Sequence, residues 1–128
     1  MILSVAGCSE EPENEFLSPP PVITPQTWAN VSRLKCTFQT ARWCSQKECT
    51  DAKPAADVYW TPSDGTYERC GDGGCDKYKA QTTDSGSFRN LSLPENGSLA
   101  RVTADNKIVE VLTLWDKVLI RHGHCSPG

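Results

Sequence analysis

From residue 28 onward, apolar and polar residues alternate in short runs that glycine, proline, asparagine and aspartate interrupt. Alternation with a period of two is typical of β-strands, whose successive side chains face opposite sides of a sheet. The apolar spacing of three and four residues that an amphipathic helix needs is not sustained in this part of the chain. The sequence predicts strands at residues 34–43, 57–61, 78–81, 87–93, 98–104, 108–115 and 118–122.

Turn residues join the last of these strands into hairpins. Asn96-Gly97 and Asp105-Asn106 tolerate positive φ, and Trp115-Asp116-Lys117 is predicted to be a third tight reversal. Residues 108–115 are nearly apolar on both faces, so they are predicted to form a central strand. The end of the chain should therefore contain three or four antiparallel strands.

A chain of 128 residues is long enough for one hydrophobic core. Seven short strands that close on themselves predict an all-β domain over residues 28–128, either a small antiparallel β-barrel or a sandwich, with the barrel favoured. Closure removes the exposed strand edges at which sheets aggregate.

Seven cysteines divide into one near the N-terminus and six in the domain. Six cysteines in a small exported domain are typical of three disulfides, because a modest core needs covalent support and an oxidising compartment preserves the bonds. The single residue is Cys8, and the six are Cys36, Cys44, Cys49, Cys70, Cys75 and Cys125.

Sequence proximity favours one of the fifteen pairings that six cysteines allow. Cys44 is close to Cys49 and Cys70 is close to Cys75, which leaves the first and last cysteines of the domain to seal the sheet. In the chain-entropy model the long loop contributes roughly 4.6 kcal/mol and a six-residue loop roughly 2 kcal/mol. We therefore expect the long bridge to matter most for stability.

Residues Val5-Ala6-Gly7-Cys8 resemble the lipobox of bacterial lipoproteins, in which small residues allow a signal peptidase to cut before a cysteine that carries lipid. The resemblance implies a truncated signal peptide at residues 1–7 and lipidation of Cys8. Ser9 implies sorting to the outer membrane of a Gram-negative bacterium. The proline-rich segment 8–27 would then be a semi-rigid tether that reaches about 60 Å from the membrane.

A second compartment is also open. Asn30-Val31-Ser32, Asn90-Leu91-Ser92 and Asn96-Gly97-Ser98 are N-glycosylation sequons, which would suit a secreted eukaryotic protein. Such tripeptides also arise by chance in loops rich in asparagine and serine. Both alternatives predict an extracytoplasmic domain.

The charge distribution argues against nucleic acid as a partner. The formal net charge is −3, and the glutamates before residue 16 carry the excess, so the domain itself is nearly neutral. Nucleic acids and anionic membrane surfaces are bound by basic patches. We expect the chain to reach a membrane through its lipid anchor only.

Residues with catalytic or metal-binding chemistry form no complete set in the sequence. His122-Gly123-His124-Cys125 does not have the spacing of a zinc motif, and an oxidised cysteine supplies no thiolate. Asp72 and Asp76 lack the ligand pattern of an EF-hand. Glu110 is expected on the exposed polar face of a sheet. We assign no catalytic residue, metal ligand or cofactor, and predict a protein that is not an enzyme.

Aromatic residues cluster at Trp43, Tyr59-Trp60 and Trp115. Rings at the rim of a barrel would form a binding patch, because Trp and Tyr bring a large contact area at low entropic cost. At least two of these three tryptophans are expected to pack in the core.

From Cys36 to Cys125 the chain resembles uncharacterised small exported proteins of alphaproteobacteria, through its cysteine spacing, its β-rich body and its Gly-x-Cys ending. The resemblance implies an envelope location and no activity. Residues 84–88 also resemble a Ser-Gly loop in the membrane-bound inhibitors of c-type lysozyme, which are small lipidated β-barrels. That likeness adds Ser85 and Gly86 to the candidate binding residues.

Together these features predict an envelope-anchored, non-enzymatic binding module, or an accessory subunit of an envelope complex, with a protein partner. Two alternatives stay open: a periplasmic inhibitor of c-type lysozyme, and a small metal-binding protein or enzyme. A tethered domain without a recognisable active site favours the first prediction.

Overall fold

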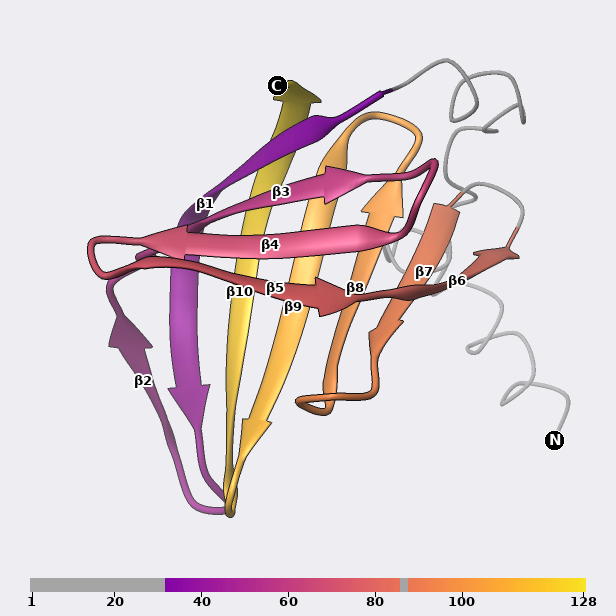
Figure 1. Cartoon of the computed structure of the whole chain (residues 1–128). Helices are drawn as coiled ribbons and strands as arrows, with labels where there is room; N and C mark the ends of the chain where they lie inside the picture. The colour runs from indigo at the N-terminus through magenta and orange to yellow at the C-terminus, as the bar shows by residue number, and fades with distance from the viewer. Residues whose placement is uncertain (1–31, 86–87) are drawn as a thin grey trace, which may run out of the picture.

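The computed structural model describes residues 32–85 and 88–128, which form ten β-strands and no helix (Figure 1). This confirms the predicted all-β class. The strands are β1 (Leu34–Cys44), β2 (Cys49–Ala52), β3 (Asp57–Thr61), β4 (Thr66–Gly71), β5 (Gly74–Lys79), β6 (Gln81–Ser85), β7 (Phe88–Leu93), β8 (Ser98–Thr103), β9 (Lys107–Leu114) and β10 (Lys117–Pro127). Cys8, the segments predicted to be a signal peptide (1–7) and a tether (8–27), and Gly86 lie outside the described residues. No described segment is an apolar helix of a length that could cross a membrane.

The strands form one antiparallel sheet that curls into a nearly closed barrel. Its order is β5-β4-β3-β1-β10-β9-β8-β7-β6, and β2 pairs with the far end of β1. The two strands at the ends of this order, β5 and β6, are consecutive in the chain and are separated by Ala80 alone. The Ala80 nitrogen donates a hydrogen bond of 2.8 Å to the carbonyl oxygen of Gly65. One bent segment therefore pairs with β4 through its first half and with β7 through its second half, and its covalent continuity closes the barrel.

The structure has three more strands than the seven that the sequence predicts. The predicted strand at 78–81 is wrong, because the chain bends at Ala80 and divides that segment between β5 and β6. The strands β2 and β4 fall outside the predicted set. β2 is short and almost wholly exposed, and β4 contains one completely buried residue, Tyr67. Pairing with neighbouring strands, rather than their own composition, makes these segments strands.

β1 and β10 pair along almost their whole length and are the two longest strands, in the middle of the sheet. Their register shifts between Phe38 and Thr40, so Gln39 is an extra residue that forms a bulge in β1. Next to this bulge, a Cβ atom on Gly123 would lie 2.1 Å from the carbonyl oxygen of Thr37. Glycine is therefore required in the Gly-x-Cys ending by the close approach of two backbones.

The core lies between the long strands and the layer of β3, β4 and β5 that crosses them in Figure 1. Trp60 and Tyr67 are its largest completely buried side chains, and both come from the crossing layer. The other core residues are Leu34, Cys36, Phe38, Val58, Ala80, Leu91, Leu93, Ala100, Val102, Ile108 and Cys125.

The three disulfides follow the pairing that sequence proximity favours. They are Cys36–Cys125, Cys44–Cys49 and Cys70–Cys75. In each bridge the two cysteines stand directly opposite one another in an antiparallel pair of strands. The first bridge is buried and joins the first strand to the last, whereas the other two close the β1–β2 and β4–β5 hairpins.

Glu110 is completely buried on β9, so the expectation that it lies on an exposed face is wrong. Nε of Arg121 donates to Oε1 of Glu110 at 2.7 Å. Nη2 of Arg69 and the hydroxyl of Tyr67 donate to Oε2 at 2.8 and 2.5 Å. Nη1 of Arg121 also donates to the carbonyl oxygen of Ala56 at 2.9 Å. Arg121 faces Glu110 from the neighbouring strand β10, whereas Tyr67 and Arg69 lie on β4, 43 and 41 residues away. The pattern along β9 alone therefore did not reveal that a buried carboxylate could be satisfied there.

Candidate functional site

The β1–β2 and β9–β10 hairpins end beside one another, beyond the region that the crossing layer covers (Figure 1). The strand register places Trp43 opposite Thr50 and Leu119, and places Leu119 opposite Leu112. By alternation these side chains share the face that carries the buried Arg121 nearer to the barrel. They are only partly buried or exposed, since no second layer of described residues packs on this end. The sheet thus continues past its own core.

An open hollow of about 500 Å³ lies at this end of the molecule. A smaller hollow of about 50 Å³ adjoins it and extends to Ser45 and Glu48 of the β1–β2 hairpin. The residues around the larger hollow, which we call the hairpin-tip site, are Trp43, Thr50, Leu114, Trp115, Asp116 and Lys117.

Trp115 is the most conspicuous residue of the hairpin-tip site. It follows Leu114 in the β9–β10 turn, its side chain is 100% exposed, and its φ is +57°. The left-handed region costs an ordinary L-residue about 1–2 kcal/mol, and hairpin turns commonly place Gly, Asn or Asp there. Leu114 is also 49% exposed. Folding alone does not favour a bulky, exposed ring at a strained position, and such outliers are common at functional sites.

The rim of the hairpin-tip site is polar. In residues 32–85 and 88–128, the side chains of Thr50, Asp116 and Lys117 form no hydrogen bond or ion pair with another residue. A hydroxyl, a carboxylate and an ammonium group are therefore available beside two tryptophan rings. Aromatic anchors with a few polar groups around them are typical of binding surfaces.

The structure brings together two of the predicted binding residues, Trp43 and Trp115. Trp60 is completely buried in the core, so its proposed place on a binding surface is wrong. Tyr59 lies near the other end of β1, where the Arg33 guanidinium stands 4.3 Å from its ring centroid. Ser85 ends β6, and Gly86 lies outside the described residues.

The expectation that at least two tryptophans fill the core is also wrong. Trp60 alone of the three is buried, Trp43 is half-buried, and Trp115 is exposed. The sequence did not point to Thr50, Asp116 or Lys117 as site residues. One signal was available, because the apolar pair Leu114-Trp115 runs directly into a predicted turn. Thr50 could not be found in this way, since its position depends on the pairing of β2 with β1.

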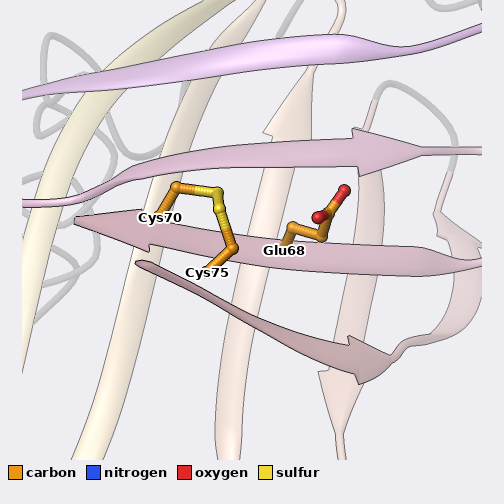
Figure 2. A group of neighbouring side chains, drawn as sticks. All are labelled: Glu68, Cys70 and Cys75. Atoms are coloured by element: carbon orange, nitrogen blue, oxygen red, sulfur yellow. A yellow bond between two sulfur atoms is a disulfide. The ribbon is translucent and has the colours of Figure 1, made fainter. Parts of the chain in front are cut away.

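A second group of side chains has the composition of a metal site. One ligand atom each of Glu68, Cys70 and Cys75 lie within 4.8 Å of one another. Figure 2 shows, however, that the two sulfur atoms are joined in the β4–β5 hairpin, and a disulfide supplies no thiolate ligand. Oε1 of Glu68 also lies 3.6 Å from Nη2 of Arg33. This group is therefore better described as a structural disulfide beside an ion-paired carboxylate.

The two histidines do not join this group. His122 and His124 are exposed on β10 and flank Gly123, on the face opposite to the buried Arg121 and Cys125. Their strand neighbours include Thr40 and Lys107, which are not metal ligands of the usual kind. Both histidines thus belong to the outer surface of the sheet.

Comparison of the chain with protein-family models, with curated proteins and with solved structures finds no match. The function is therefore inferred from the residues and their geometry alone. In that geometry, the hairpin-tip site is the place where exposed apolar surface, backbone strain and available polar groups coincide.

Proposed function

We propose that this chain is a non-enzymatic binding module of the cell envelope that holds a protein partner at the hairpin-tip site. The observation that carries the proposal is Trp115, whose ring is completely exposed on a backbone with a φ of +57°. Nothing in the described fold uses this ring, yet the turn carries its energetic cost. A partner that buries the ring would gain binding free energy from the apolar surface removed from water, which offsets this cost.

The composition of the hairpin-tip site suits a protein partner. Tryptophan is enriched among the residues that dominate interface energies, and such anchors are commonly surrounded by a polar rim. Trp43 and Trp115 supply the anchors, and Thr50, Asp116 and Lys117 supply the rim. The site also lies at the tips of two neighbouring hairpins, so a partner can reach it without rearrangement of the barrel.

The proposed location has separate support. Three disulfides are consistent with an extracytoplasmic protein, because reducing compartments do not preserve such bonds. In the proposal, lipid on Cys8 anchors the chain in the envelope of a Gram-negative bacterium, and the proline-rich tether gives the domain reach. Lipidation is tested by mass spectrometry of the mature protein, in which Cys8 should carry the added fatty acids.

The proposal is tested by affinity capture with the full-length chain from envelopes of its own host. Trp115→Ala and Trp43→Ala should each lose the same captured protein. We expect the dissociation constant measured with that protein to rise at least 30-fold for each variant, which corresponds to a binding hot spot of about 2 kcal/mol.

The matched control is Leu99→Ala, which removes a 56% exposed apolar side chain from β8, outside the hairpin-tip site. This variant should bind as the wild type does. Equal binding by Trp115→Ala and the wild type would contradict the proposal, as would an equal loss of binding in Leu99→Ala. The melting temperatures of all three variants should show that each remains folded.

A further inference from the structure

The Cys44–Cys49 disulfide joins the two residues that adjoin Trp43 and Thr50 of the hairpin-tip site. Cys44 follows Trp43 directly, and Thr50 follows Cys49 directly. In the antiparallel pairing of β1 with β2, Trp43 stands directly opposite Thr50, and Cys44 stands directly opposite Cys49. The bridge therefore fixes the separation of two residues that line both hollows.

Little else holds β2 in place. This strand has four residues, none of them buried, and among the described strands it pairs with β1 only. The Arg42–Asp51 ion pair across it spans 3.3 Å, but both side chains are largely exposed, at 57% and 92%, and such pairs contribute little to stability. Short, isolated two-stranded pairings are marginal in water. The disulfide is thus the main constraint on Thr50.

The turn between the two cysteines is ordered by Ser45. The backbone nitrogens of Lys47 and Glu48 donate to Oγ of Ser45 at 3.2 and 3.3 Å, and the Ser45 nitrogen donates to the carbonyl oxygen of Glu48 at 2.8 Å. These bonds define the turn, but they act within the loop and do not attach β2 to the core. They would not by themselves keep Thr50 opposite Trp43.

The three bridges differ in access to a reductant. Cys36 and Cys125 are 0% and 5% exposed in the core. Cys49 and Cys75 are exposed, so both hairpin bridges are open to attack. Of these two, only the Cys44–Cys49 bridge adjoins residues of the hairpin-tip site.

We infer that the Cys44–Cys49 disulfide is a redox latch on the hairpin-tip site, an inference that rests on the proposed function of that site. The reductant is a dithiol. Its thiolate attacks Sγ of Cys49, and Cys44 leaves as a thiolate that takes up a proton. The second thiol of the reductant then attacks the mixed disulfide and releases Cys49. Two electrons and two protons pass to the protein, the reductant becomes a disulfide, and β2 separates from β1.

The latch is tested on the full chain with the double variant Cys44→Ala/Cys49→Ala. Protection of the amides of residues 49–52 against hydrogen exchange should fall about 30-fold, which is the loop constraint that a six-residue disulfide ring supplies. Quenching of tryptophan fluorescence by acrylamide should rise, because Trp43 loses its cover. Trypsin should also cut more rapidly at Lys47.

The matched control is Cys70→Ala/Cys75→Ala, since both bridges close hairpins with a sequence separation of 5. This variant should leave protection at residues 49–52 and the quenching unchanged. Equal protection of residues 49–52 in the wild type and in the Cys44→Ala/Cys49→Ala variant would overturn the latch. So would alkylation of Cys36 and Cys125 before Cys44 and Cys49 as dithiothreitol is raised.

Binding of the captured partner separates the two proposals. Loss of binding in both Trp115→Ala and Cys44→Ala/Cys49→Ala supports both. Loss in Trp115→Ala with full binding by the disulfide variant rejects the latch and leaves the binding site intact as a proposal. Full binding by Trp115→Ala rejects the binding site, and with it the regulatory meaning of the latch.

Discussion

The hydroxyl of Tyr67 on β4 donates a hydrogen bond of 2.5 Å to Oε2 of Glu110 on β9, across the core and 43 residues away in sequence. The same oxygen accepts Nη2 of Arg69 at 2.8 Å, and the other carboxylate oxygen accepts Nε of Arg121. The Glu110 carboxylate thus balances the charge of two guanidinium groups, and it links β4 of the crossing layer to the long strands β9 and β10. The centroid of the Phe38 ring lies 3.8 Å from the Arg121 guanidinium carbon, so an aromatic face also packs on this cation.

Replacement of Glu110 by Gln should lower the free energy of unfolding by about 3–5 kcal/mol. The substitution keeps the shape of the side chain but leaves Arg69 and Arg121 without a buried counter-charge. Urea denaturation measures the loss. Glu48→Gln, in the exposed β1–β2 turn, is the control and should change stability by less than about 0.5 kcal/mol. A Glu110→Gln variant as stable as this control would show that the network does not hold the layers together.

Tyr67 should make the fold sensitive to alkaline pH. Burial, and then the charge of Glu110, raise the pKa of Tyr67 well above its usual value of 10.0. The folded state keeps the phenol protonated where an unfolded tyrosine ionises. Because the folded pKa is the higher one, this stabilisation is fully present below about pH 10 and is lost as the pH rises from there towards the folded pKa.

The measurement is urea denaturation between pH 9 and 11 of the wild type and of Tyr67→Phe. Above about pH 10 the wild type should lose up to about 1.4 kcal/mol per pH unit more than the variant, as expected for one proton. Parallel pH profiles would contradict the assignment of this proton to Tyr67.

Much of the fold could be predicted from the sequence, because its main signals are local. Alternating apolar residues and Asn or Gly turns located β7, β8 and β9 to within one residue at each end, and cysteine spacing indicated the correct bridges. The start of β10 was also predicted, but the strand continues to Pro127, five residues beyond the predicted end. The bend at Ala80 could not be predicted, since it results from barrel closure. The burial of Glu110 depends on Arg69 and Arg121, which alternation within a single strand does not reveal.

The candidate site was predicted in part for the same reason. Trp43 and Trp115 are conspicuous as residue types, but their proximity arises from two hairpins that end side by side. The sequence also grouped Trp60 with them, although alternation along β3 buries Trp60 and leaves Tyr59 on the other face. Composition identified candidate rings, and only the sheet register distinguished those in the core from those on the surface.

The three disulfides should contribute unequally to stability. The Cys36–Cys125 bridge closes a loop with a sequence separation of 89 and is buried, whereas each hairpin bridge has a separation of 5. Replacement of each pair by alanines should cost roughly 4.6 kcal/mol for the long bridge and roughly 2 kcal/mol for either short one, in the chain-entropy model. Thermal melting of the three double variants measures this order. Equal melting temperatures would refute it.

Trp115→Asn should stabilise the fold while it removes the proposed anchor. Asparagine tolerates the left-handed conformation that the β9–β10 turn imposes, and the exposed indole gives up no buried contact. The free energy of unfolding should rise by about 1 kcal/mol, with an increase in Tm of about 4 °C. Scanning calorimetry measures the change. A lower Tm in this variant would mean that the ring supports the fold, and would remove the reason to assign it to a partner.

In the proposed function, the hairpin-tip site binds a protein partner in the envelope. This binding is tested most directly by placing a photo-crosslinking amino acid at Asp116 in the full-length chain, in living cells of its host, with the same label at the exposed Thr83 of β6 as the control. One discrete adduct should form from position 116, be absent from position 83, and be lost when Trp43 is also changed to alanine. No adduct from position 116, or the same adduct from both positions, would contradict it.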